Sequence, residues 1–358
     1  MRLPDDIRSQ FLALVRLGIG HSVPDIPESI DWPCIQALAK EHGLTAIVMD
    51  GVDAVNALQP PIDIKYQLIG SVVQGFECRY DTYRSAIAEM AAFYRKHGLK
   101  MMLLKGMACS MTWPIPQHRP IGDIDIWQFG ESGKADDLIS SELGINVDSS
   151  HHHHTVFHWR GFMVENHFDF INIYHHKSNM ELEKIFKELA KDDSHYVDIL
   201  GEKVYLPSPN LHALFLLKHS MIHFSAGELN LRQLLDWALY VKEYHSEIDW
   251  DWLSAVVDRY GMRPAYSIFN AICVEDLGFD PVLFRETACS PEMKERVLSE
   301  IISPEFQGEM PDSRLRRIVF KLRRWSANSW KHGLCYSDSM WSAFWSGVKN
   351  HLLKPSSI

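Results

Sequence analysis

Two acidic residues separated by one apolar residue are the clearest chemical signal in this chain. Asp123 and Asp125 lie in the run Gly-Asp-Ile-Asp-Ile-Trp. Such alternation predicts a β-strand, in which residues i and i+2 face the same side of a sheet. Two carboxylates held side by side repel each other unless they share a proton or bind a cation. Oxygen ligands favour Mg²⁺ or Mn²⁺. The same pair also occurs in solvated turns, but charged residues are depleted in strands, so this context favours a metal site.

A third acidic ligand is expected nearby, because a two-metal site needs more oxygen atoms than two side chains provide. The run FMVENHFDF supplies candidates. Glu165, His167 and Asp169 alternate with Val164, Asn166 and Phe168, which predicts that the three polar residues share one strand face. Glu165 is the preferred third ligand, and Asp169 is the alternative.

The elements that must position these acids predict an α+β fold, a small mixed sheet between helical regions. Residues 1–98 form an N-terminal helical region, residues 99–207 an α/β core and residues 208–358 a C-terminal helical domain. One long helix is predicted from Lys65 to His97, because apolar side chains recur there every three or four residues. The predicted strands of the core are LKMMLLKG, GDIDIWQ, EKVYLPSP and the two arms of a hairpin, HTVFHW and FMVENHFDF, broken at Arg160-Gly161.

Composition describes an ordinary globular protein of two or three domains. Of 358 residues, 46% are hydrophobic and 23% charged, and the formal charge of −10 argues against a general nucleic-acid-binding surface. Six cysteines without a CxxC pair indicate reduced thiols in the cytoplasm, not disulfides or a zinc site. Neither a signal peptide nor a transmembrane segment is predicted.

Taken together, these motifs resemble a known family. The order LKG, then Arg-x-x-Gly-Asp-Ile-Asp-Ile, a His-rich segment and Val-Glu-x-His-Phe is similar to an uncharacterised bacterial nucleotidyltransferase family. That family belongs to the DNA polymerase beta-like nucleotidyltransferase superfamily. The resemblance extends through LPSPNLHALFLLKHSMIH and LRQLLDWA, over roughly residues 30 to 340.

The resemblance implies a metal-dependent enzyme. Asp123, Asp125 and Glu165 would hold two Mg²⁺ or Mn²⁺ ions, which bind a nucleoside triphosphate and activate an acceptor hydroxyl. A nucleoside monophosphate would be transferred and pyrophosphate released. ATP is the default donor. A small hydroxyl compound, a sugar intermediate or a protein is favoured as acceptor over RNA, because the chain is acidic and has no RNA-binding module.

The phosphate-binding residues depart from the superfamily's usual Gly-Ser pair. Here the pair is Lys105-Gly106. Gly106 would let backbone amides approach a phosphate at a helix start, and Lys105 would supply positive charge. Arg119 is the second expected phosphate ligand, since a guanidinium binds in a bidentate way. The alternative for Lys105 is a surface lysine at a strand end.

Other charged or imidazole-rich segments have weaker assignments. His151–His154 are expected at the hairpin edge beside the active site, with at most two of them facing one ion. His219 and His223, four residues apart on a predicted helix, are expected to pack together. The basic segment Arg314–Arg324 is either a solvated helix or a binding surface for an anionic partner.

Two alternatives to an active nucleotidyltransferase stay open. One is a catalytically inactive nucleotide- or metal-binding regulatory protein. The other is a toxin-like enzyme that modifies a cellular target.

Overall fold

The computed structural model describes residues 3–24, 29–55, 58–174, 176–306, 311, 313–341 and 345. The chain divides into two compact units. One comprises the residues up to Val72 together with Leu216–Met340, and the other runs over Val73–Phe215 and takes in Trp341. The candidate site residues Lys105, Asp123, Asp125 and Glu165 all belong to the second unit. The α+β class predicted from the sequence is confirmed.

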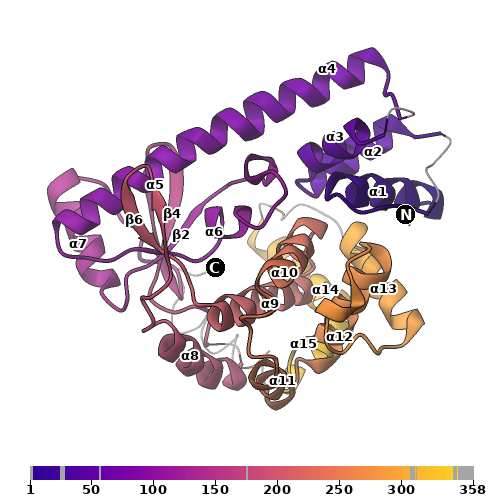
Figure 1. Ribbon diagram of the computed structural model, residues 1–358. Helices are drawn as coiled ribbons and strands as arrows, with labels where there is room; N and C mark the ends of the chain where they lie inside the picture. Colours follow the sequence, from indigo (N-terminus) through magenta and orange to yellow (C-terminus); the bar gives the residue numbers. More distant parts are fainter. Residues whose placement is uncertain are drawn as a thin grey trace. The chain divides into compact units, whose positions relative to one another are not determined.

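A six-stranded mixed sheet forms the centre of the second unit, with strand order β3-β4-β2-β1-β6-β5. β2 runs parallel to β4 and β1 parallel to β6, whereas the other pairs are antiparallel. Figure 1 labels β2, β4 and β6 in this sheet. The strand bounds are β1 (Met102–Leu103), β2 (Ile124–Trp127), β3 (His154–Trp159), β4 (Phe162–His167), β5 (Tyr196–Ile199) and β6 (Glu202–Tyr205).

Helices cover both faces of this sheet. Ile124 and Ile126 share a hydrophobic core with side chains of α5 (Cys78–Lys96) and α7 (Ser132–Leu143). On the other face, the Trp127 ring lies 4.6 Å from that of Phe170, which stacks on Phe186 of α8 (Lys177–Leu189). The alternation of side chains along β2 therefore directs Asp125, like Trp127, away from the α5 side. The remaining helices of this unit are α6 (Met107–Ser110) and a 3₁₀ turn (Pro116–His118).

The helix predicted from Lys65 to His97 is helical throughout, but it is not one regular α-helix. α4 (Ile62–Gly70) leads into a π-helical stretch (Ser71–Glu77) before α5. Gly98, with φ of 73°, follows its end, where the sequence placed the stop. The boundary between the two units falls within the π-helical stretch.

The first unit is helical. It contains the N-terminal helices that precede the sheet and most of the helices that follow it. They are α1 (Asp5–Gly18), α2 (Trp32–Glu41), α3 (Thr45–Asp53), α4, most of α9 (Pro209–Ala226), α10 (Leu231–Tyr244), α11 (Trp250–Arg259), α12 (Arg263–Ala271), a π-helical stretch (Ile272–Asp276), a 3₁₀ turn (Pro281–Leu283), α13 (Pro291–Ile302), α14 (Arg314–Ala327) and α15 (Ser329–Cys335).

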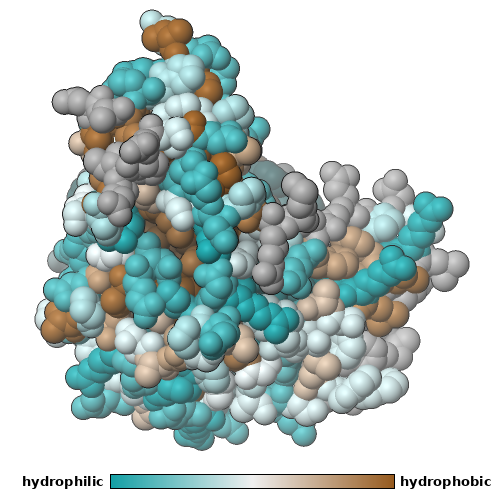
Figure 2. Space-filling view, turned by 90° about the vertical axis from the view of Figure 1, so that its right-hand side faces the viewer, coloured by the Kyte–Doolittle hydropathy of each residue, from teal (hydrophilic) through white to brown (hydrophobic). Residues whose placement is uncertain are grey.

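Over the described residues, none of the helices combines the length and apolar character needed to cross a bilayer. On the face seen in Figure 2, apolar residues are scattered in small groups among hydrophilic ones. This is the usual surface of a globular protein.

A buried histidine in the helical unit makes its stability depend on pH. His42 is 2% exposed; its Nδ1 accepts a hydrogen bond from the Leu231 amide (3.2 Å), and its Nε2 donates to the Ile302 carbonyl (3.1 Å). Accepting at Nδ1 requires the neutral ring, and burial lowers the pKa of His42 from 6.5 to about 4. Below pH 6.5 the unfolded chain therefore binds a proton that the folded chain excludes. Stability present above pH 6.5 is lost as the pH falls toward 4.

We expect the free energy of unfolding to drop by about 2 kcal/mol between pH 7 and pH 5 through His42 alone. Urea unfolding at both pH values measures this drop. The variant His42→Gln, which cannot be protonated, should show a drop smaller by about that amount. Equal drops in the two proteins would contradict this role of His42.

Candidate active site

The parallel pairing of β2 with β4 brings two of the predicted acids together. Asp125 lies opposite Glu165 in the register of the two strands. Asp125 is 1% exposed, and Glu165 is half-buried. The two carboxylates thus come from adjacent strands, 40 residues apart in the sequence, as expected for the ligands of one site.

Two cationic side chains lie against Asp125. Its Oδ1 is 2.8 Å from Lys105 Nζ and 3.2 Å from His167 Nε2, and the same His167 nitrogen is 3.6 Å from Glu165 Oε2. Burial alone would raise the pKa of Asp125, but the Lys105 charge and the His167 hydrogen bond hold it well below its usual range. Burial would lower the pKa of His167, yet its bonds to Asp125 and Glu165 raise it to about 9. Asp125, Glu165, Lys105 and His167 thus form one ionic cluster.

Asp123 contributes a carboxylate with a different environment. The strand starts two residues later than predicted, so Asp123 immediately precedes β2 instead of lying within it. Its backbone carbonyl accepts a 2.8 Å hydrogen bond from the Tyr83 hydroxyl, which anchors this end of the strand to α5. Burial, followed by the negative charge of Asp125, raises the pKa of the Asp123 carboxyl. The acids therefore concentrate negative charge that Lys105 and His167 only partly balance.

The three predicted phosphate-binding residues differ in their contacts. Lys105 is only 16% exposed and is paired with Asp125, so it is not a surface lysine. Gly106 has φ of 60° and precedes the single turn of α6, with Tyr83 packed against its Cα. Arg119 is 5% exposed and donates a 3.1 Å hydrogen bond to the Pro120 carbonyl. Lys105 is in direct contact with Asp125, a predicted metal ligand.

Asp169, the alternative third ligand, is not brought to the acids. The predicted alternation stops at His167 because β4 ends there, and Asp169 forms an ion pair with Lys187 of α8. His167 takes the place next to Glu165 instead. Its position two residues after Glu165 in Val-Glu-Asn-His is the signal in the sequence, although that spacing predicts only a shared strand face and not a ligand.

The donor set of Asp125, Glu165 and His167 fits a divalent cation. One ligand atom from each of these residues lies within 4.8 Å of the others. Among the described residues, Asp125 Oδ2 is buried and has no hydrogen-bond partner. A buried carboxylate oxygen without a partner is costly, and a bound cation would satisfy it.

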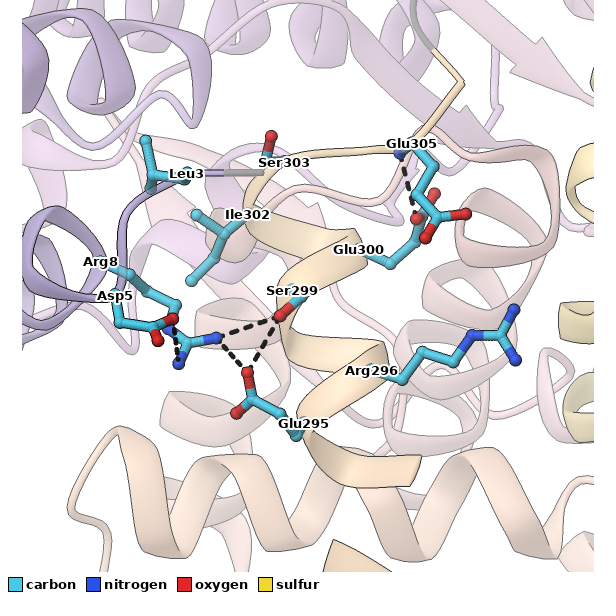
Figure 3. A pocket seen from close by; sticks show the side chains of 10 residues that line it. All are labelled: Leu3, Asp5, Arg8, Glu295, Arg296, Ser299, Glu300, Ile302, Ser303 and Glu305. Carbon is cyan, nitrogen blue, oxygen red and sulfur yellow. Dashed lines mark hydrogen bonds and ion pairs between the residues drawn. The ribbon is translucent and has the colours of Figure 1, made fainter. Parts of the chain in front are cut away.

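A cavity of about 360 Å³ lies elsewhere, in the helical unit (Figure 3), and includes none of the predicted site residues. Several of its charged groups are paired. Arg8 pairs with Asp5 and Glu295 and donates to Ser299, while Glu300 is bonded by Lys331 at 2.6 Å. We therefore assign no function to it.

The histidine pair His219 and His223 lies on α9, and the basic segment forms α14. The rings of His219 and His223 are 4.3 Å apart on α9, as expected for a packed pair. In α14, the side chains of Arg316, Lys321 and Arg323 are exposed, whereas Arg324 bonds Glu228 and the Ala226 carbonyl. An anionic partner for this helix stays a prediction.

The chain was compared with known proteins. No curated protein and no solved structure matches it. A family described as "Uncharacterised nucleotidyltransferase" matches residues 28–278, which is more than half of the chain and includes β1, β2 and β4 with the acidic cluster. This chain therefore belongs to that family of uncharacterised nucleotidyltransferases.

Proposed function

We propose that this protein transfers a nucleoside monophosphate from a nucleoside triphosphate, ATP by default, to a hydroxyl acceptor. The acceptor oxygen attacks the α-phosphorus, the bond to the β-phosphate breaks and pyrophosphate leaves. Asp123, Asp125 and Glu165 would be the metal ligands, as in the DNA polymerase beta-like superfamily that the motifs resemble. The observation that carries the proposal is the pairing of Asp125 with Glu165 across β2 and β4.

Divalent ions bound there would neutralise the triphosphate and lower the pKa of the acceptor hydroxyl. Lys105 has two roles in this proposal. Without metal, its ammonium group compensates Asp125 at 2.8 Å. With metal bound to Asp125, the attraction that holds Lys105 is reduced, and the flexible side chain is free to contact a phosphate oxygen. His167 keeps Asp125 and Glu165 together, because its Nε2 reaches both carboxylates.

Labelled nucleotides distinguish nucleotidyl transfer from phosphoryl transfer. The protein is incubated with Mg²⁺, an extract of small molecules and proteins, and ATP labelled at either the α- or the γ-phosphate. We expect products that carry the α label, with the γ label recovered in pyrophosphate. The variant Glu165→Gln should abolish labelling, whereas Asp137→Asn, which changes an exposed acid of α7, should leave it intact. Transfer of the γ label alone would show a kinase and contradict the proposal.

A further inference from the structure

Four imidazole rings gather next to the carboxylates. The centroid of the His154 ring lies 4.7 Å from that of His151, 4.4 Å from that of His153 and 5.3 Å from that of His167. The His153 and His167 rings are 5.7 Å apart. These residues come from two segments, the start of β3 and the end of β4, within one compact unit.

Backbone contacts hold the main chain of three of these histidines together. His154 is the first residue of β3 and is the direct cross-strand neighbour of His167. His153 precedes the strand, and its carbonyl accepts hydrogen bonds of 3.1 Å from the amides of Phe168 and Asp169. Successive residues of a strand point to opposite faces. His153 lies outside the strand, so its side chain can lie on the same side of the sheet as that of His154.

The free ring nitrogens point to a ligand. One nitrogen from each of His153, His154 and His167 lies within 4.8 Å of the other two. His154 is 7% exposed and His167 3% exposed. In the described part of the chain, the Nδ1 atoms of His153 and His154 are buried without a hydrogen-bond partner. Such buried nitrogens are rarely left unsatisfied, so this cluster has a cost that a bound group would remove.

The orientation of His167 is that of a metal ligand. Its Nδ1 lies 3.2 Å from the Asp169 carbonyl, and since a carbonyl can only accept, Nδ1 is the donor. In the metal-free protein Nε2 donates to Asp125, so a metal ion must displace the Nε2 proton and replace this contact. The lone pair on Nε2 is then directed at the ion. Histidines that bind metals usually donate their other ring N–H to a carbonyl or carboxylate in this way, which fixes the ring.

We propose that His153, His154 and His167 bind a borderline divalent cation of the Zn²⁺ class through their ring nitrogens. This site goes beyond the proposed function, whose metal ligands are carboxylates for hard ions. Imidazole nitrogens favour Zn²⁺, Ni²⁺ and Cu²⁺ over Mg²⁺. Three histidines with an open fourth position are a common zinc arrangement, and ligand atoms then lie about 3.4 Å apart. Small rotations of the rings would bring the three ligand nitrogens to this separation. Glu165 Oε2, 3.7 Å from His154 Nδ1, is available as a further ligand.

Metal binding is tested directly on the full chain, stripped of metal, by titration with Co²⁺ followed by competition with Zn²⁺. We expect the first equivalent of Co²⁺ to give the intense visible absorption of a tetrahedral site, and this absorption to be lost on addition of Zn²⁺ but not of Mg²⁺. The double variant His153→Ala/His154→Ala should lower the Co²⁺ affinity by at least about tenfold. His158→Ala, which removes an exposed histidine from the same strand, should leave it unchanged.

Two further variants separate this site from its alternatives. Asp123→Asn, aimed at the proposed nucleotide site, should keep the Co²⁺ affinity within about threefold, so failure of one proposal does not mimic failure of the other. His219→Ala/His223→Ala removes the packed pair on α9 and should also have no effect. The proposal is overturned if His153→Ala/His154→Ala binds Co²⁺ like the wild type, or if binding is lost with the α9 pair. If the first equivalent of Co²⁺ bound to the wild type gave only the weak visible absorption of an octahedral site, that result alone would also overturn the proposal.

Discussion

Asp125→Asn is expected to remove metal-dependent nucleotide binding and, in addition, to destabilise the metal-free protein by about 3–5 kcal/mol. The Asp125 carboxylate is 1% exposed and lies between Lys105 at 2.8 Å and His167 at 3.2 Å. A neutral amide would leave both cations buried without their counter-ion. Urea unfolding in the presence of a chelator measures the loss.

Asp123→Asn provides the matched comparison. The pKa of Asp123 is raised by burial and by the charge of Asp125, so ionisation of this carboxyl is less favourable in the folded than in the unfolded chain. Removing that charge should leave the free energy of unfolding unchanged or slightly higher, while nucleotide binding is still lost. If Asp123→Asn destabilised the protein as much as Asp125→Asn, the acids would form a structural ion cluster, and the assignment as metal ligands would be wrong.

The second large effect is expected for Gly106→Ala. Gly106 has φ of 60° and ψ of −109°, and an added Cβ would fall far inside van der Waals contact with the Tyr83 hydroxyl. Backbone strain and overpacking together should cost about 2–4 kcal/mol of stability. Because the same hydroxyl donates to the Asp123 carbonyl at 2.8 Å, the clash should also displace Asp123 and weaken nucleotide binding. Thermal unfolding and nucleotide titration measure the two effects.

Two controls separate backbone strain from the clash. Gly144 has a similar φ of 65°, but nothing lies within 4 Å of a Cβ built there, so Gly144→Ala should cost only about 1–2 kcal/mol. In Gly106→Ala/Tyr83→Phe the nearest atom of the ring would be Cζ, at 3.4 Å. We therefore expect the double variant to be more stable than the sum of the single effects by about 1–2 kcal/mol. Strict additivity would contradict the predicted contact.

Local patterns in the sequence were sufficient to predict most elements of the core. The hairpin of β3 and β4 turns at Arg160 and Gly161, which both adopt positive φ, 50° and 84°. This is the geometry that a tight two-residue turn requires. The short strand β5 was missed, because its residues Tyr196–Ile199 are mostly exposed and carry no long apolar run. The π-helical stretch before α5 also leaves no periodic signal, since apolar residues continue at helical spacing.

Non-local contacts limited the prediction of the site. The choice of Glu165 followed from strand alternation, but the pairing of β2 with β4 depends on the whole sheet. Sequence spacing could not reveal that Lys105 would meet Asp125, because the two residues lie on opposite sides of a Pro-rich loop. The sequence predicts His151–His154 beside the active site, but it does not predict that His153 and His154 join His167. Two of these three histidines precede the hairpin turn, and the third follows it.

The most direct test of the central claim is calorimetric titration of nucleoside triphosphates into the wild type and Asp123→Asn, with Mg²⁺ and with chelator. Binding, unlike transfer, does not require the acceptor. We predict that the wild type binds a nucleoside triphosphate with Mg²⁺, and that chelator or Asp123→Asn weakens binding at least about tenfold. Equal affinity with and without metal, equal affinity in the variant, or no binding by the folded wild type would contradict the assignment of Asp123, Asp125 and Glu165 as the metal ligands for nucleotide.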